Sequence, residues 1–111
     1  MTIIRIDARR LTDAAGLHVT MSEAFGFPDS YGKNLDALVD CLTYLDDPKA
    51  GMSRVQVFPG EMALLVLEHT DGKGKQQAVQ MKALVDAVAF VNWRRLETGA
   101  PPVLALAYER A

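Results

Sequence analysis

The feature of this chain that most constrains its fold is one continuous apolar run. In the segment EMALLVLEHT (61–70), six apolar residues stand between Glu61 and Glu68. The run is far too short to span a membrane as a helix, and it is typical of a β-strand that is buried on both faces. Strands of this kind belong mostly to parallel sheets that helices cover.

Two more short strands are predicted, TIIRI (2–6) near the start and PVLALAY (102–108) near the end. Apolar residues at helical spacing predict three helices between the strands, at about 12–26, 34–47 and 75–98. The order strand, two helices, strand, helix, strand favours parallel pairing with right-handed crossovers. The sequence therefore predicts one α/β domain over residues 1–111, with a three-stranded parallel sheet packed with helices in the order β-α-α-β-α-β.

Apolar spacing also predicts which residues form the core. In the second helix these are Leu35, Leu38, Val39, Leu42 and Leu45. The third helix is apolar nearly all round in its middle, so we expect it to be substantially buried through Val79, Leu84, Val85, Val88, Ala89, Trp93 and Leu96. Residues 48–60 are predicted to form a loop, in which RVQVF (54–58) could pair weakly as an edge strand.

Charge and composition exclude several kinds of partner. The formal net charge is −2, and the basic pairs Arg9-Arg10 and Arg94-Arg95 are too small and scattered for a nucleic-acid patch. No segment suits a membrane span, and the N-terminus lacks a signal-peptide layout. A single cysteine, Cys41, fits a reducing compartment. We therefore expect a cytoplasmic protein without direct nucleic-acid or membrane contact, whose partner is a basic protein.

One face of the second predicted helix carries carboxylates at a spacing that folding does not require. On a helical wheel Asp36, Asp40, Thr43 and Asp47 form a narrow stripe nearly opposite the leucines. Asp36 and Asp40 are like charges one turn apart, while Asp46 and Asp47 lie near the C-terminal end, where the helix dipole is already negative. The stripe is either a solvated polar face or a surface that docks into a cationic cleft, and the wheel alone leaves both open.

The residues around this stripe resemble the barstar family of ribonuclease inhibitors. The segment YGKNLDALVDCLT (31–43) is very close to that family's signature of Tyr-Gly, Asn-Leu-Asp-Ala-Leu and Asp-Cys-Leu-Thr. Looser similarity extends over Ile3–Asp7, Leu17-His18, Pro28 and LLVLE (64–68). The resemblance thus covers most of the chain, although residues 46–60 look like an insertion.

The resemblance implies a three-stranded parallel sheet with helices. It also implies an intracellular inhibitor, acting as an antitoxin or immunity protein, without catalytic activity or a cofactor. Its implied partner is a cognate secreted ribonuclease, or a related toxin, whose basic active-site cleft the second helix and the preceding loop would plug. Asp40 would be the central mimic of an RNA phosphate, and Asp36 a neighbouring carboxylate paired with a cleft arginine. Thr43 would lie at the contact edge, and Tyr31, Gly32 and Asn34 would shape the approach.

The chain departs from the family pattern around this acidic centre. Ser30 stands where the family's namesake has an aromatic residue, Val39 and Leu45 stand where it has tryptophans, and Arg94 lies near a glutamate position. We therefore expect the target toxin to differ from that of the family's namesake. The full set of predicted partner-binding residues is Ser30, Tyr31, Gly32, Asn34, Asp36, Val39, Asp40, Thr43, Tyr44 and Asp47.

Two other functions remain open from the sequence. The first keeps the fold but binds a non-nuclease protein with a basic groove. The second is a small hydrolase that uses His69 with Glu68 and Asp71, although no nucleophile–base pair is evident. Of the remaining side chains, we expect Cys41 to be a buried inert thiol, His18 to lie at the surface or boundary, and Trp93 to be a core aromatic. No metal-ligand spacing is present.

Overall fold

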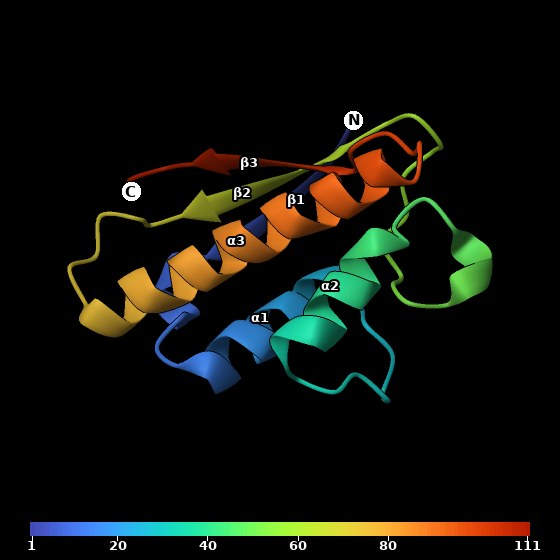
Figure 1. Cartoon of the computed structure of the whole chain (residues 1–111). Helices are drawn as coiled ribbons and strands as arrows, with labels where there is room; N and C mark the ends of the chain where they lie inside the picture. Colours follow the sequence, from blue (N-terminus) through green and yellow to red (C-terminus); the bar gives the residue numbers. More distant parts are fainter.

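The apolar run predicts a strand, and this strand, β2 (Ala63–Glu68), is the central one of the sheet. The computed structural model describes residues 1–111. In it β2 pairs in parallel with β1 (Thr2–Asp7) on one side and with β3 (Leu104–Tyr108) on the other (Figure 1). Four of the six β2 residues are buried. The predicted three-stranded parallel sheet is therefore confirmed.

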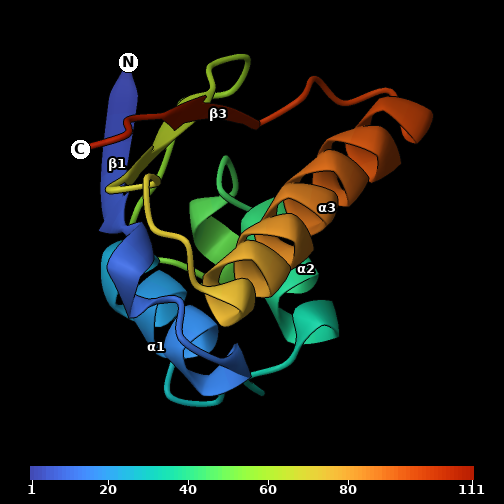
Figure 2. The same cartoon turned by 90° about the vertical axis from the view of Figure 1, so that its left-hand side faces the viewer.

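The helices connect the strands in the predicted order. α1 (Ala14–Phe25) and α2 (Leu35–Thr43) lie between β1 and β2, and α3 (Lys75–Glu97) lies between β2 and β3. Two short 3₁₀ turns, η1 (Ala8–Arg10) and η2 (Pro48–Ala50), complete the chain. Figure 2 shows all three helices on one side of the sheet. The α/β fold with the order β-α-α-β-α-β is confirmed, and none of its helices has the length and apolarity that a membrane span needs.

α2 is shorter than predicted. Asn34 caps its start, since the Asn34 Oδ1 accepts a hydrogen bond from the Ala37 N–H at 2.8 Å. The helix ends at Thr43 and does not continue to residue 47. The Thr43 carbonyl accepts a hydrogen bond from the Arg95 guanidinium of α3 at 2.6 Å, and the Leu45 carbonyl accepts one from the Val57 N–H at 3.0 Å. These long-range bonds replace the ones that would extend the helix.

α3 is buried along one face only, so the prediction that it is substantially buried holds for Leu84 and Val88 but is wrong for several of the other residues that it names. Its buried residues are Gln80, Leu84, Ala87, Val88, Val91 and Arg95. Val79, Trp93 and Leu96 are 50%, 54% and 58% exposed, and Ala89 is exposed too. The reason is that α3 packs against the sheet and α2 with one face only, so nothing covers the other.

Residues 48–60 form an anchored loop, and the edge strand considered at 54–58 is absent. The Phe25 carbonyl near the end of α1 accepts hydrogen bonds from the Ser53 hydroxyl at 2.7 Å and from the Arg54 and Val55 N–H groups at 3.0 and 3.1 Å. Val57 is buried in the core. The loop therefore satisfies a carbonyl at the C-terminal end of α1 instead of extending the sheet.

Candidate functional site

α2 presents the two central predicted carboxylates to solvent. Leu38 and Leu42 face the core and are completely buried, whereas Asp36 and Asp40 lie on the exposed side of the helix. None of the seven ion pairs in the chain involves Asp36. Asp36 stands in the first turn of α2, where the positive end of the helix dipole favours a carboxylate. Both carboxylates are thus accessible to a partner.

Arg94 of α3 approaches the Asp40 carboxylate, a contact that the sequence does not predict. Arg94 Nη1 lies 3.7 Å from Asp40 Oδ1, and the two side chains are 40% and 56% exposed. The same guanidinium lies over the Phe90 ring, 5.7 Å from its centroid. An exposed pair of this kind contributes about 0–1 kcal/mol to stability. Asp40 therefore has a weak internal partner that another cation could displace.

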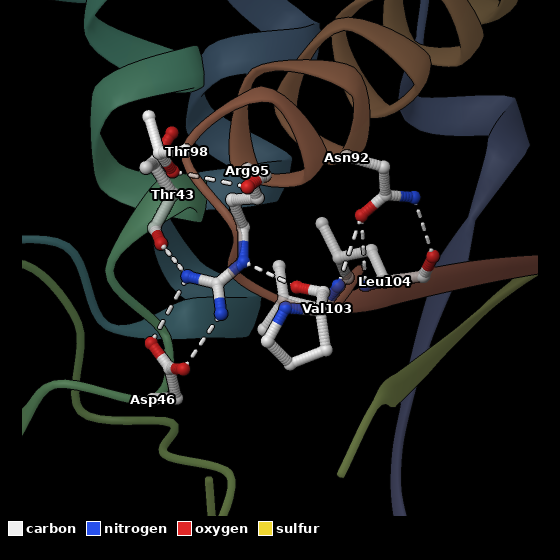
Figure 3. Close-up of polar contacts among 8 residues, drawn as sticks. Thr43, Asp46, Asn92, Arg95, Thr98, Val103 and Leu104 are labelled. Atoms are coloured by element: carbon white, nitrogen blue, oxygen red, sulfur yellow. Dashed lines mark hydrogen bonds and ion pairs between the residues drawn. The ribbon is translucent and has the colours of Figure 1, made fainter. Parts of the chain in front are cut away.

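Arg95, the next residue, is buried and holds the chain that follows α2 (Figure 3). Its Nη2 donates to Asp46 Oδ2 at 2.6 Å, and its Nη1 donates to Asp46 Oδ1 at 3.1 Å and to the Thr43 carbonyl at 2.6 Å. Its Nε donates to the Pro101 carbonyl at 2.8 Å. The side-chain hydrogen bonds from Arg95 lower the pKa of Asp46 below its ordinary value. Asp46 is therefore a structural residue of the fold.

Asn92, one turn before these arginines on α3, fixes the start of β3 in the same region (Figure 3). Its Oδ1 accepts hydrogen bonds from the Val103 N–H at 2.9 Å and the Leu104 N–H at 3.3 Å, and its Nδ2 donates to the Leu104 carbonyl at 2.8 Å. The C-terminal half of α3 thus positions both β3 and the end of α2, which sets the direction of the acidic face.

The C-terminal part of the predicted stripe differs from the helical wheel. Thr43 is partly buried, and its hydroxyl donates to the Val39 carbonyl at 2.7 Å. Tyr44 beside it is 42% exposed. Asp47 lies beyond the helix and caps η2, where its carboxylate accepts a hydrogen bond from the Lys49 N–H at 3.1 Å. Its placement on the helical stripe is wrong because α2 ends at Thr43.

The loop between α1 and α2 is anchored from inside by Tyr31. Tyr31 is 8% exposed, its hydroxyl lies 2.6 Å from His18 Nδ1, and its ring centroid lies 4.8 Å from that of Phe27. Burial raises the pKa of Tyr31 and lowers the pKa of His18. The expectation that His18 lies at the surface or boundary is wrong, since it is buried against Tyr31. Of the partner-binding residues predicted in this loop, Ser30, Gly32 and Asn34 are exposed.

Val39 and Leu45, which stand where the family's namesake has tryptophans, both point inward. Leu45 is completely buried and Val39 is 7% exposed. Val39 forms part of the floor of an open groove between α2 and α3, which no sequence pattern predicts. Leu35 stands at the rim of this groove and is 45% exposed, so the prediction that it faces the core is wrong. Leu35 stands in the first turn of α2, where α3 leaves its side chain partly uncovered.

The alternative hydrolytic residues are not assembled into a catalytic arrangement. Glu68 forms an ion pair with Arg5 at 3.5 Å, His69 has a positive φ of 58°, and Asp71 is exposed in the following turn. The only hydrogen bond at His69 that involves a side chain joins its backbone carbonyl to Gln77, so no partner orients its imidazole as a base. No three His, Cys, Asp or Glu side chains are grouped so as to hold a metal ion.

Cys41 is buried, as the sequence predicts. It is 2% exposed, and burial is the largest cause of the raised pKa of its thiol, with the charge of Asp40 adding to it. A high pKa keeps the thiol protonated and weakly nucleophilic. Cys41 therefore acts as a small core residue beneath the acidic face.

Comparisons with known proteins identify the family. The chain matches the model of the family described as "Barstar (barnase inhibitor)" over residues 1–106. It is also similar to the "Putative ribonuclease inhibitor YrdF" of Bacillus subtilis (strain 168), with 49% identity over 43 residues. That match covers 39% of this chain and 47% of the relative, or about half of the relative's length. Because the family match extends over nearly the whole sequence and the fold agrees with it, the chain belongs to the Barstar family.

Proposed function

We propose that this chain is an intracellular inhibitor that binds a bacterial ribonuclease and blocks its active site with α2. Membership of the Barstar family, together with a relative named as a ribonuclease inhibitor, supports a general role in ribonuclease inhibition. The observation that carries the finer proposal is the exposure of Asp36 and Asp40 on one side of a helix that buries Leu38 and Leu42 on the other.

The physical basis is mimicry of the RNA backbone. A ribonuclease cleft binds phosphates with cationic side chains, and carboxylates on a helix offer those cations a similar charge. Aspartate side chains are short, so little conformational freedom is lost when they are fixed in an interface. Complementary charge speeds association and makes the rate fall with ionic strength, while the desolvated central pairs control dissociation.

Asp40 takes the central role in this proposal, and Asp36 is its neighbour. The Arg94 contact at 3.7 Å is exposed on both sides, so an arginine of the nuclease can share or replace it without a large cost in free energy. Ser30, Gly32 and Asn34 border the carboxylates from the loop, and Thr43 and Tyr44 border them at the other end. Tyr31, Val39 and Asp47 contribute mainly by shaping the surface around these contacts.

The target in this proposal is a toxin that differs from barnase at the contact edge. Ser30 is small, and Val39 and Leu45 point inward, so none of them offers a large aromatic ring to a partner. Arg94 adds a cation near a position where the family's namesake has a glutamate. A cognate secreted ribonuclease, or a related toxin with a basic cleft, would fit this surface, with the chain acting as its cytoplasmic antitoxin or immunity protein.

The test begins with the partner. Immobilised chain would retain its partner from extracts of the source cells, and the retained protein would be assayed for RNA cleavage with and without added free chain. Purified barnase serves as a second, defined enzyme in the same assay. We expect RNA cleavage by the retained protein to stop at about one equivalent of the chain.

Variants then locate the blocking surface. Asp40→Ala and Asp36→Ala are compared with Asp71→Ala, which removes an exposed aspartate in the turn after β2. Loss of Asp40 should weaken inhibition by about 2–5 kcal/mol, a range for charged interfaces that rests in part on the barnase–barstar pair itself. Equal inhibition by Asp40→Ala and Asp71→Ala would show that α2 is not the plug. A retained basic protein without ribonuclease activity would instead support a Barstar-family binding protein for a non-nuclease partner.

A further inference from the structure

An open groove between α2 and α3 adjoins the acidic face. It has a volume of about 550 Å³ and is bounded mainly by apolar side chains. These side chains are Leu35, Val39, Val79, Ala83, Ala87 and Phe90. Two packed helices normally close such a space with their own side chains. Here Val39, Ala83 and Ala87 are small, so the groove remains open.

The apolar rim of the groove is exposed to solvent. Leu35, Val79 and Phe90 are 45%, 50% and 45% exposed, although they stand on two different helices and face one shared hollow. Single exposed apolar residues are common, but a contiguous group of them around a concave surface marks an interaction site. The rim is therefore suited to receive an apolar side chain.

Charge around the groove indicates the kind of partner. Asp36 lines the α2 wall and takes part in no ion pair, whereas Lys82 and Asp86 on the α3 wall neutralise each other at 2.7 Å. The excess charge in the groove is therefore negative and lies with Asp36. At one end, Phe90 lies under the Arg94 guanidinium that also approaches Asp40, so the groove is continuous with the acidic face of α2.

We propose that this groove receives an apolar side chain of the ribonuclease that is flanked by a basic residue. The apolar side chain would pack between Val79 and Phe90, above Val39 and Ala83, and the basic residue would pair with Asp36. This inference rests on the proposed function and adds to it a second contact that recognises the target by packing and not by charge alone. A buried apolar anchor of this kind provides selectivity among clefts that are all cationic.

A second copy of this chain fits the groove less well. Docking of two copies through this face would bring Asp36 and Asp40 of each molecule close to those of the other, and such like-charge contacts oppose association. A basic partner has the complementary charge. The ribonuclease is therefore the better occupant.

The experiment compares matched variants for binding to the ribonuclease that the wild-type chain retains. Val79→Asn places a neutral polar group at the groove rim, Phe90→Ala removes one wall, and Ala83→Leu fills the space without removing any contact. Leu96→Ala is the control on the same helix, since Leu96 is 58% exposed and does not line the groove. Val19→Asn is the control for the polar substitution, on α1, where Val19 is 41% exposed.

We expect each groove variant to raise the dissociation constant at least about tenfold, mainly through faster dissociation. The two controls should stay within about twofold of the wild type. Urea unfolding of each variant confirms that the fold is retained. If Phe90→Ala unfolds, the exposed Val79→Asn and the filling variant Ala83→Leu still decide the outcome.

Asp40→Ala separates this inference from the proposed function. If Asp40→Ala weakens binding while all three groove variants bind as the wild type does, the groove inference is wrong, and the proposal that α2 blocks the active site with its carboxylates (the acidic plug) is supported. If the groove variants weaken binding and Asp40→Ala does not, the groove stands and the acidic plug is wrong. A concentration-dependent dimer that Val79→Asn abolishes without any change in ribonuclease binding would assign the groove to a second copy and overturn the inference.

Discussion

Arg94 and Arg95 are neighbours in the sequence, and each approaches an aspartate in or just after α2. The Arg94–Asp40 pair and the Arg95–Asp46 pair differ in burial and in distance. Arg95 is buried and makes contacts of 2.6 to 3.1 Å with Asp46 and with two backbone carbonyls. Arg94 is half-exposed and lies 3.7 Å from Asp40. One pair belongs to the fold, and the other lies on the surface that we assign to a partner.

The difference follows from helical geometry and from the cost of burying charge. Successive residues on a helix point about 100° apart, so one arginine faces the core while the next faces solvent. A guanidinium that leaves water needs several good acceptors, and Arg95 has them in Asp46, Thr43 and Pro101. Arg94 stays hydrated and needs none. Its pair with Asp40 can therefore be exchanged, which is what a binding carboxylate requires.

The largest effect that tests this comparison is on stability. Arg95→Ala leaves the Asp46 carboxylate and two carbonyls without their donor, so the free energy of unfolding should fall by about 3–5 kcal/mol. Arg94→Ala breaks only an exposed pair and should change it by no more than about 1 kcal/mol. Urea unfolding of both variants measures this difference. Equal losses would mean that the buried network does not hold α2.

Acid pH provides a second test through Asp46. Its folded-state pKa is lowered by Arg95, so it stabilises the protein above the unfolded pKa, near 4, and this contribution is lost as the pH falls toward the folded pKa. In that range the free energy of unfolding of Asp46→Asn should fall less steeply with decreasing pH than that of the wild type. The two slopes should differ by at most about 1.4 kcal/mol per pH unit. Urea unfolding at several pH values measures the slopes, and parallel slopes would contradict the assignment.

Arg94→Glu should affect the rate of binding more than stability. The change removes the internal cation beside Asp40 and adds a carboxylate, so association with a cationic cleft should be several-fold faster. This corresponds to an activation free energy of association that is lower by about 1 kcal/mol. The dependence of the rate on salt should also become steeper. Stopped-flow association at two salt concentrations tests this, with Arg110→Glu near the C-terminus as the control. Slower association would mean that the nuclease presents an acidic residue to Arg94.

The smallest predicted effect is on the stability of Asp40→Ala. The change relieves repulsion with Asp36 and favours the helix, but it removes the Arg94 pair. These terms offset each other, so the free energy of unfolding should stay within about 0.5 kcal/mol of the wild type. Thermal unfolding measures it. A larger loss would place Asp40 with Asp46 among the structural carboxylates and remove the contrast between the two pairs.

The features that the sequence predicts correctly are local. The apolar run of β2 and the exposure of Asp36 and Asp40 depend on residue types and spacing within a few turns of chain. The order of strands and helices follows from those local patterns. Because parallel strands need long crossovers, that order also leads to the correct sheet.

The features that the sequence does not predict depend on residues far apart in the chain. α2 ends where Arg95, 52 positions later, binds the Thr43 carbonyl. His18 is buried because its ring forms a hydrogen bond with the Tyr31 hydroxyl. The 48–60 loop is held in place by hydrogen bonds to the Phe25 carbonyl. α3 is apolar on several sides, so its periodicity does not say which side stays uncovered. The groove follows from this uncovered side.

The most direct test of the central claim is the affinity of Asp40→Ala for the retained ribonuclease, measured beside Asp71→Ala in the same buffer. The account predicts that Asp40→Ala keeps its stability but loses about 2–5 kcal/mol of binding free energy, while Asp71→Ala binds as the wild type does. An Asp40→Ala protein that is fully folded and inhibits as tightly as Asp71→Ala would contradict the claim that α2 blocks the nuclease by imitating RNA phosphates.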